Sequence, residues 1–177
     1  MENKFFTKEK LLPLILTALV LIFDQITKAL VVKYVPISFV GANDNLINII
    51  HVKNTGIAFS MGDSFPVFFR KFLFVLVPLV VIGLVCVVYF RNNDFTKLQR
   101  WSICGIIGGG LGNLIDRIFR ADGVVDFVDV KFFGIFGLNR WPTFNVADAS
   151  VVICGILMII SFIVVFSKES KKGGKNE

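Results

Sequence analysis

The sequence has little charge and only one histidine. Charged residues make up 18% of the 177-residue chain, whereas 55% of its residues are hydrophobic. A soluble domain of this length cannot bury that much apolar surface, so the composition excludes an ordinary soluble globular protein. A zinc site or a Ser–His–Asp triad needs more ligands or bases than His51 alone supplies, so we expect no metal and no cofactor.

Cysteine is scarce, and phosphate-binding motifs are missing. The three cysteines, Cys86, Cys104 and Cys154, lie in long apolar stretches without CxxC spacing, which indicates buried positions and no disulfide framework. The glycines between Gly108 and Gly112 are not followed by GK[ST], so they favour close helix packing over a phosphate loop. The net charge of +6 forms no basic stripe, and we expect no nucleic-acid partner.

Long apolar runs take the place of charge in this sequence. A helix needs about 20 apolar residues to cross roughly 30 Å of hydrocarbon. Four segments meet this requirement: residues 11–32, 72–90, 101–119 and 146–166. The predicted fold is an all-α polytopic membrane protein with four transmembrane helices, which form a single membrane domain over residues 1–166.

The distribution of basic residues predicts the orientation of these helices. Residues 1–10, 91–100 and 167–177 hold 10 lysines and arginines in 31 residues. Residues 33–71 and 117–145 hold only 8 in 68 residues. Because basic residues concentrate on the cytoplasmic side of membrane proteins, we expect both termini in the cytoplasm.

The two segments predicted outside the membrane, residues 33–71 and 120–145, are too short for a separate domain and too long for simple turns. Residues 46–53 (LINIIHVK) are rich in β-branched side chains and predict a strand. We therefore expect a small extracytoplasmic β-sheet and loop cap over the membrane domain. Residues 167–177 are low in complexity and predict a disordered cytoplasmic tail.

Three carboxylates converge on the outer part of the predicted bilayer. Asp24 lies about 12 Å below the outer end of the first span, Asp116 ends the third, and Asp148 lies in the first turn of the fourth. A charge at this depth costs several kcal/mol unless it is paired, hydrated or functional, so these residues are candidates for a site.

Structural roles are also open for the same residues. Lys28 lies four residues after Asp24 and could be its ion-pair partner. Asp116 beside Arg117 could simply end a helix at the interface. Asn145 could cap the last span, where the helix dipole favours a carboxylate. Two close carboxylates can instead share one proton, and such a pair can hydrolyse an amide without a metal.

Five ordered motifs carry a resemblance that covers nearly the whole chain. They are DQITK (24–28), NTGIAFS (54–60), GGLGNLIDR (109–117), GVVDF (123–127) and PTFNVAD (142–148). With these motifs in this membrane placement, the chain resembles the bacterial lipoprotein signal peptidases, also called signal peptidase II, which are membrane aspartic peptidases.

The resemblance implies a catalytic pair, Asp126 and Asp148. It also implies that eight residues line or support the substrate pocket: Asp24, Lys28, Asn54, Gly56, Asn113, Asp116, Arg117 and Asn145. The implied substrate is a lipoprotein precursor with a diacylglyceryl-modified cysteine, cleaved on the amino side of that cysteine. The implied location is the bacterial cytoplasmic (inner) membrane, with the active site near the outer face, membrane lipid as a neighbour and a monomer sufficient for activity.

The sequence departs from the family pattern in two places. Asp116 and Asp126 are ten residues apart, one more than the family pattern, and we expect the extra residue to bulge in a loop. Ile57 stands where a smaller residue is expected and could narrow the pocket. We also predict that the helix dipole keeps Asp148 ionised, which leaves the shared proton on Asp126.

Two other functions remain possible at this stage. A small proton-coupled transporter or channel could use Asp24, Lys28 and Asp116 as a relay. The chain has no visible internal repeat, and the inner halves of the predicted helices lack ionisable groups, which disfavours this function. A non-catalytic protein that binds acylated peptides is the other alternative, and the presence of both Asp126 and Asp148 disfavours it.

Overall fold

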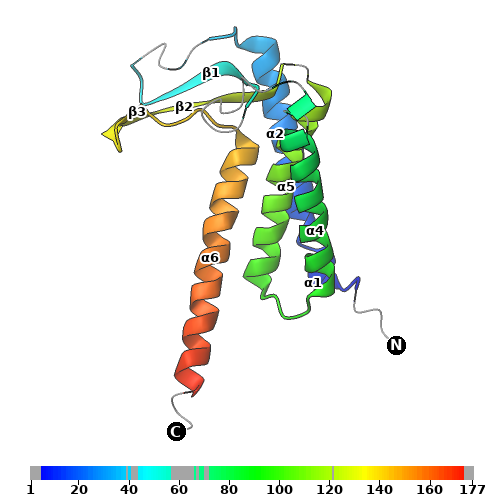
Figure 1. Ribbon diagram of the computed structural model, residues 1–177. Coiled ribbons are helices and arrows are strands. Elements are labelled where there is room, and N and C mark those ends of the chain that lie inside the picture. Colours follow the sequence, from blue (N-terminus) through cyan, green and yellow to red (C-terminus); the bar gives the residue numbers. More distant parts are fainter. Residues whose placement is uncertain are drawn as a thin grey trace.

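A helical bundle carries a small sheet at one end in the computed structural model of the chain (Figure 1). The structure describes residues 5–38, 40, 44–56, 66, 68–69, 72–120 and 122–173, with the backbone alone for residues 169–173. The short helix α1 (Lys8–Leu11) and the C-terminal end of the last helix lie at the end opposite the sheet. Ile57, where the sequence predicts a narrowing of the pocket, lies outside the described residues.

The first long helix, α2 (Leu14–Tyr34), follows α1 after a break at Pro13. Proline interrupts the helix because it has no amide hydrogen to donate to the preceding turn. At this end of the bundle the buried Lys10 side chain donates to the carbonyl of Phe90 at 2.5 Å and to Oδ1 of Asn93 at 2.9 Å. These bonds hold α1 against residues 90–93, which lie at the same end of the bundle.

The next helical segment consists of a π-helical turn, η2 (Phe72–Leu76), followed by α4 (Val77–Arg91). Pro78 lies at the start of α4, where its missing amide hydrogen costs no helical hydrogen bond. The next helix, α5 (Lys97–Phe119), begins with a capping box in which Thr96 and Gln99 bond each other's backbone amides. Helix α5 packs against α2, α4 and α6 and is therefore the centre of the bundle.

Three helical stretches in the described part of the chain are long and apolar enough to cross a membrane: Lys8–Tyr34, Phe72–Arg91 and Val146–Lys168. Helix α5 has 23 residues but carries polar side chains such as Asn113 and Asp116. The prediction of a polytopic membrane protein is confirmed in this coarser form, and the fourth span stays a prediction.

Helix α6 (Val146–Gly173) continues well past the predicted end of the last span. The structure thus has helix as far as Gly173, where the sequence predicts a disordered tail from residue 167, and residues 174–177 lie outside the described residues. The lysines and glutamate in this stretch are good helix formers, and a helix already formed in the span extends at little cost.

Three antiparallel strands, β1 (Ile47–Asn54), β2 (Val124–Ile135) and β3 (Leu138–Arg140), form one sheet in this order. The strand predicted at residues 46–53 is confirmed as β1, shifted by one residue. Strand β2 replaces the loop in which the sequence placed Asp126. Its register sets Asn54 opposite Val124 and Val52 opposite Asp126. The end of β1 therefore lies beside the start of β2, which carries Asp126.

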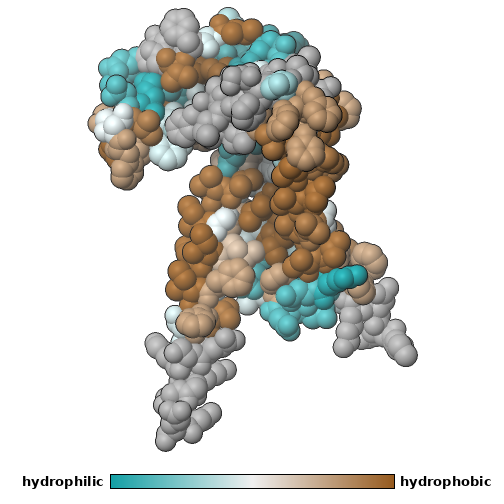
Figure 2. All heavy atoms as spheres, in the orientation of Figure 1, coloured by the Kyte–Doolittle hydropathy of each residue, from teal (hydrophilic) through white to brown (hydrophobic). Residues whose placement is uncertain are grey.

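The outer surface of the helices is hydrophobic along most of their length. Figure 2 shows brown residues over the bundle and teal residues over the sheet and at the opposite end. Exposed side chains on the helices include Ile22, Leu84, Val152 and Ile163. Lipid is the solvent that suits such a surface, so the chain is a multi-pass membrane protein.

Close packing of α5 on its neighbours depends on glycine. A methyl group at Gly109 would meet the backbone carbonyl of Ala147 and would lie 2.8 Å from Cγ2 of Val151. A methyl group at Gly112 would lie 2.6 Å from Oδ2 of Asp24. These two glycines therefore allow α6 and α2 to approach α5 at the level where the polar residues gather.

Replacement of Gly109 by alanine should lower the thermal unfolding temperature of the detergent-solubilised protein. We expect a loss of about 1–3 kcal/mol, because the added methyl group forces α5 and α6 apart. Gly155→Ala is the matched control, since a methyl group at Gly155 has nothing within 4 Å. Equal unfolding temperatures for the two variants would contradict this account of the α5–α6 contact.

Candidate active site

Asp126 and Asp148 come from different parts of the fold. Asp126 lies in β2 and is only 3% exposed, whereas Asp148 lies in the first turn of α6 and is half-buried. Asn145 connects them. Its side-chain amide donates to Oδ1 of Asp126 at 2.7 Å, and its backbone N–H donates to Oδ2 of Asp148 at 3.1 Å.

Asn145 also caps α6. The N–H of Asp148 donates to Oδ1 of Asn145 at 2.9 Å, and the reverse bond from the Asn145 N–H completes the reciprocal pattern of a capping box. The structural role considered for these residues is therefore real. It also holds the Asp148 carboxylate at a defined place beside Asp126.

Asn113 of α5 fixes the second oxygen of Asp148. Its side-chain amide donates to Oδ1 of Asp148 at 2.7 Å. Its own Oδ1 accepts from the Asn145 amide and from the ammonium group of Lys28, each at 3.0 Å. Because these donors orient the Asn113 amide, the position of Asp148 depends on α2 and α5 as well as on its own helix.

A buried ion-pair network lies below this pair. The ammonium group of Lys28 is 2.8 Å from Oδ2 of Asp24 and 3.1 Å from Oδ2 of Asp116, and all three side chains are fully buried. Oδ1 of Asp24 accepts the N–H of Ala147 at 3.0 Å. The pairing of Asp24 with Lys28 that the sequence suggests is thus part of a larger network that ends at the first turn of α6.

Gln25 belongs to this network, although we assigned it no role from the sequence. Its side-chain amide lies 3.1 Å from Oδ2 of Asp24, 3.2 Å from the Gly112 carbonyl and 3.1 Å from Oδ1 of Asp116. A polar residue beside Asp24 within an apolar run was the available signal. Gln25 therefore joins the two carboxylates across the α2–α5 contact.

Asp116 links α5 to the sheet. Its Oδ2 accepts the N–H of Val125 in β2 at 3.2 Å, and Nε of Arg120 lies 3.1 Å from its Oδ1. Arg120 is a second residue to which the sequence assigned no role. Asp116 is therefore more than a helix end at the interface, because it holds the strand that carries Asp126.

Helix α5 ends at Phe119 and β2 begins at Val124, so a short connection lies between Asp116 and Asp126, and the predicted bulge of the extra residue stays a prediction. In this short connection Gly123 has a φ of +92°, and a side chain there would collide with the Asn54 carbonyl. Glycine is required at this position because a left-handed backbone and a close neighbour coincide. The turn places the start of β2 beside Asn54.

Asn54 completes the surroundings of Asp126. Its side-chain amide donates to Oδ2 of Asp126 at 3.0 Å, and its Oδ1 accepts the N–H of Gly56 at 3.1 Å. This second bond fixes the amide through a local turn. The structure thus brings Asn54 directly to the carboxyl group, whereas Gly56 contributes only its backbone.

Arg117 is placed less directly. It is half-buried on α5, with its guanidinium carbon 5.9 Å from the ring centre of Phe74. It interacts electrostatically with Asp148, Asp126 and Asp116. The structure therefore brings Arg117 to the side of the carboxylate pair without a defined hydrogen bond to it.

Burial gives Asp126 the properties of an acid. Loss of solvent raises its pKa to about 6, and the nearby charge of Asp148 acts in the same direction. Hydrogen bonds from Asn54 and Asn145 and the charge of Lys28 oppose this rise in pKa. Within the described residues no group of three or more His, Cys, Asp or Glu side chains is arranged to hold a metal ion. Because the pKa of Asp126 is raised, the pair can exchange protons with a bound water or peptide.

Comparison with known proteins gives the family of the chain. The sequence profile of the family described as Signal peptidase (SPase) II matches residues 16–164. A lipoprotein signal peptidase from Treponema denticola is 48% identical over 172 residues, which are 97% of this chain and 98% of the relative. The one from Treponema pallidum is also 48% identical over 172 residues, covering 96% and 92%.

A solved structure agrees with the sequence comparisons. This structure, of a bacterial membrane enzyme determined by the in meso method, matches with a TM-score of 0.73 and 27% identity, over 88% of this chain and 90% of the other. A profile match over most of the chain and relatives of this identity and coverage show a common family. The chain belongs to the signal peptidase II family.

Proposed function

We propose that this protein removes signal peptides from diacylglyceryl-modified prolipoproteins by cleaving the peptide bond on the amino side of the lipidated cysteine. It acts as an aspartic endopeptidase with Asp126 and Asp148 as the catalytic pair. The observation that carries this proposal is the bridge of Asn145 between a buried Asp126 and a half-buried Asp148. Family membership supplies the reaction class.

The two carboxyl groups have different roles. Asp148 lies at the positive end of α6, which favours its ionised form as the general base. Asp126 is buried and has a raised pKa, which favours its protonated form as the general acid. As water attacks the scissile carbonyl carbon, Asp148 takes the water proton and Asp126 gives its proton to the carbonyl oxygen. When the C–N bond then breaks, Asp148 gives its proton to the leaving nitrogen, and the Asp126 carboxylate takes back a proton from a hydroxyl group of the tetrahedral intermediate, which restores both groups.

The remaining site residues support or line the pocket. Asp24, Lys28 and Asp116 are fully buried, so they act as supports for α6 and β2. Asn113 and Asn145 orient the catalytic carboxylates. Asn54, Gly56 and Arg117 are the groups proposed to meet the peptide.

The arrangement of the bundle suits a site at the outer face of the cytoplasmic membrane. With α5 as the fourth span, both ends of the chain lie in the cytoplasm and the sheet lies outside. The hairpin between β2 and β3 exposes Phe133 by 69% and Phe136 by 90%. Aromatic side chains of this kind concentrate at the membrane surface, which supports this placement of the sheet. A monomer provides every residue of the site.

Asp126→Asn and Asp148→Asn should each reduce cleavage of a diacylglyceryl-modified precursor by at least about a hundredfold, because each removes one proton-transfer group. Cleavage is followed by gel shift with purified protein in detergent, without added metal. Asp44→Asn is the control, since Asp44 is exposed and pairs with Lys131 far from the site. Full activity in either site variant would show that the catalytic pair is wrongly assigned.

The pH profile should report Asp126. Since the mechanism needs its protonated form, kcat/KM should fall about tenfold per pH unit as the pH rises above about 6. Asn54→Ala removes a hydrogen bond to the ionised form, so the pKa of Asp126 should rise and the falling limb should move to higher pH. Kinetics of wild type and variant between pH 4.5 and about 8.5 test this sign. A limb that stays in place or moves to lower pH would refute the role of Asp126 as the acid.

A further inference from the structure

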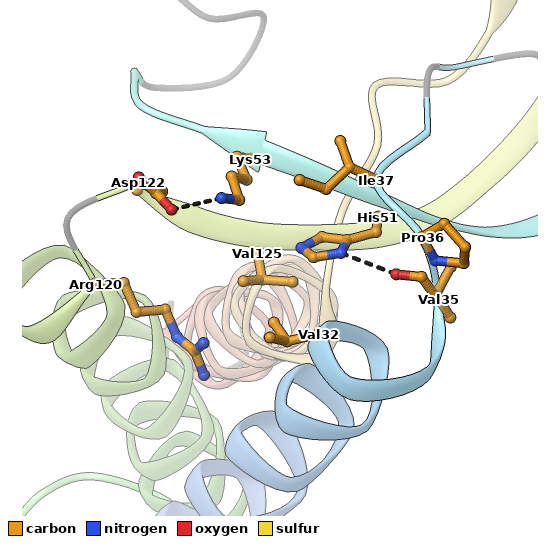
Figure 3. Close-up of a pocket in the computed structure, with 10 residues that line it drawn as sticks. Val32, Val35, Pro36, Ile37, His51, Lys53, Arg120, Asp122 and Val125 are labelled. Atoms are coloured by element: carbon orange, nitrogen blue, oxygen red, sulfur yellow. Dashed lines mark hydrogen bonds and ion pairs between the residues drawn. The ribbon is translucent and has the colours of Figure 1, made fainter.

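A second pocket lies outside the catalytic pair, between the outer end of α2, the sheet and the connection from α5 to β2. Its volume is about 490 Å³. Figure 3 shows Val32 of α2 below it, the sheet above it and Arg120 at one side. Apolar side chains therefore form its walls, and a few polar groups point into it.

This pocket is separate from the peptidase site. Val125 lines it, whereas the next residue, Asp126, belongs to the catalytic pair. Successive side chains of a strand point to opposite faces of the sheet. Val125 and Phe127 accordingly pack with Val31 of α2. The pocket and the catalytic pair thus lie on opposite faces of β2.

His51 presents an unpartnered nitrogen to this pocket. The side chain is 4% exposed, and Nδ1 lies 3.1 Å from the carbonyl oxygen of Val35. Because a carbonyl can only accept, Nδ1 carries the proton, and Nε2 of the neutral ring is an acceptor. Nε2 is buried and has no hydrogen-bond partner. Figure 3 shows it on the ring edge away from Val35, toward Val125, so a donor from a ligand would satisfy it.

Two cationic side chains face the same space. Arg120 uses Nε for Asp116, and Arg120 is also one of the residues that line the pocket. Lys53 pairs with Asp122 at 2.5 Å, and the two side chains are 37% and 66% exposed. Exposed ion pairs are weak, so Lys53 can also serve an anionic ligand. Arginine and lysine together are the usual partners of a phosphate group.

The position of the pocket, near the end of a membrane-spanning stretch, favours a lipid as its ligand. Val32 and Ile37 line it and are exposed, and Val32 lies near the outer end of the membrane-spanning stretch Lys8–Tyr34. Lipid headgroups lie at this level, and the hydrocarbon chains below them contact apolar helix surface such as that of α2. A lipid can therefore place its phosphate in the pocket and its chains along the helix.

We propose that this pocket binds an anionic membrane phospholipid whose headgroup carries a free hydroxyl, as in phosphatidylglycerol. Arg120 and Lys53 bind the phosphodiester, and Nε2 of His51 accepts a hydrogen bond from the headgroup hydroxyl. The proposal does not depend on the peptidase activity, because neither Asp126 nor Asp148 lines the pocket.

The test uses two lipids with one phosphodiester each, of which one has hydroxyls in its headgroup and the other has none. The full-length protein in detergent is mixed with phosphatidylglycerol or with phosphatidylethanol, and native mass spectrometry measures the retained lipid. Both carry one phosphodiester charge, but only phosphatidylglycerol can donate to His51. We expect wild type to retain phosphatidylglycerol about fivefold better, as one additional hydrogen bond provides. Equal retention of the two lipids would overturn the role of His51.

Three variants separate the contributions. His51→Asn keeps a donor for the Val35 carbonyl but removes Nε2, so it should bind both lipids equally, at the wild-type level for phosphatidylethanol. Arg120→Gln should weaken both lipids about tenfold or more. Lys53→Gln should weaken both lipids as well, and it serves as the second variant if Arg120→Gln does not fold.

Lys33→Gln is the matched control, because Lys33 is an exposed cation at the same end of α2 that does not line the pocket. It should leave lipid retention unchanged. A loss equal to that of Arg120→Gln would show general surface attraction and overturn the proposal. Displacement of the lipid by an equal concentration of glycerol phosphate or of a soluble peptide would also overturn it, because the ligand would then not be a lipid.

Discussion

The rest of the site depends on the buried ion pairs that the ammonium group of Lys28 forms with Asp24 and Asp116. This ammonium group lies among Asp24, Asp116 and Asn113 in a fully buried position. An isolated charge in that environment would be very costly, so α2 and α5 must assemble with these groups in register. The network bonds the first turn of α6 and strand β2 through Asp24 and Asp116, so it supports the elements that carry Asp148 and Asp126.

The same network positions the two elements that carry the proposed catalytic carboxylates. Asp24 holds the N–H of Ala147 at the start of α6, while Asp116 holds the N–H of Val125 in β2. One carboxylate thus fixes the helix that carries Asp148, and the other fixes the strand that carries Asp126. The start of α6 and strand β2 are thereby fixed relative to each other, with Asn145 bonded to both carboxylates.

Strand β2 separates two environments. One face carries Asp126, enclosed by Asn54 and Asn145. The other face carries Val125, which packs toward α2 and lines the pocket beside His51 and Arg120. Since Arg120 also bonds Asp116, the ionic support of the peptidase site and the proposed lipid pocket share one side chain. The end of the bundle that carries the sheet therefore combines the proposed peptidase site with the proposed lipid pocket.

Apolar runs, basic residues and motifs determined the membrane class, the approximate spans, strand β1 and the level of Asp24, Asp116 and Asp148. These features are local, since they follow from the cost of placing each side chain in lipid or water. Asp126 was found only through the family resemblance, because it has no membrane signal of its own. The tertiary structure alone decided that Asn145 bridges the pair and that Gln25 and Arg120 join the ionic network. Such contacts connect residues up to 91 positions apart, and no local pattern of hydropathy or propensity records which distant groups will meet.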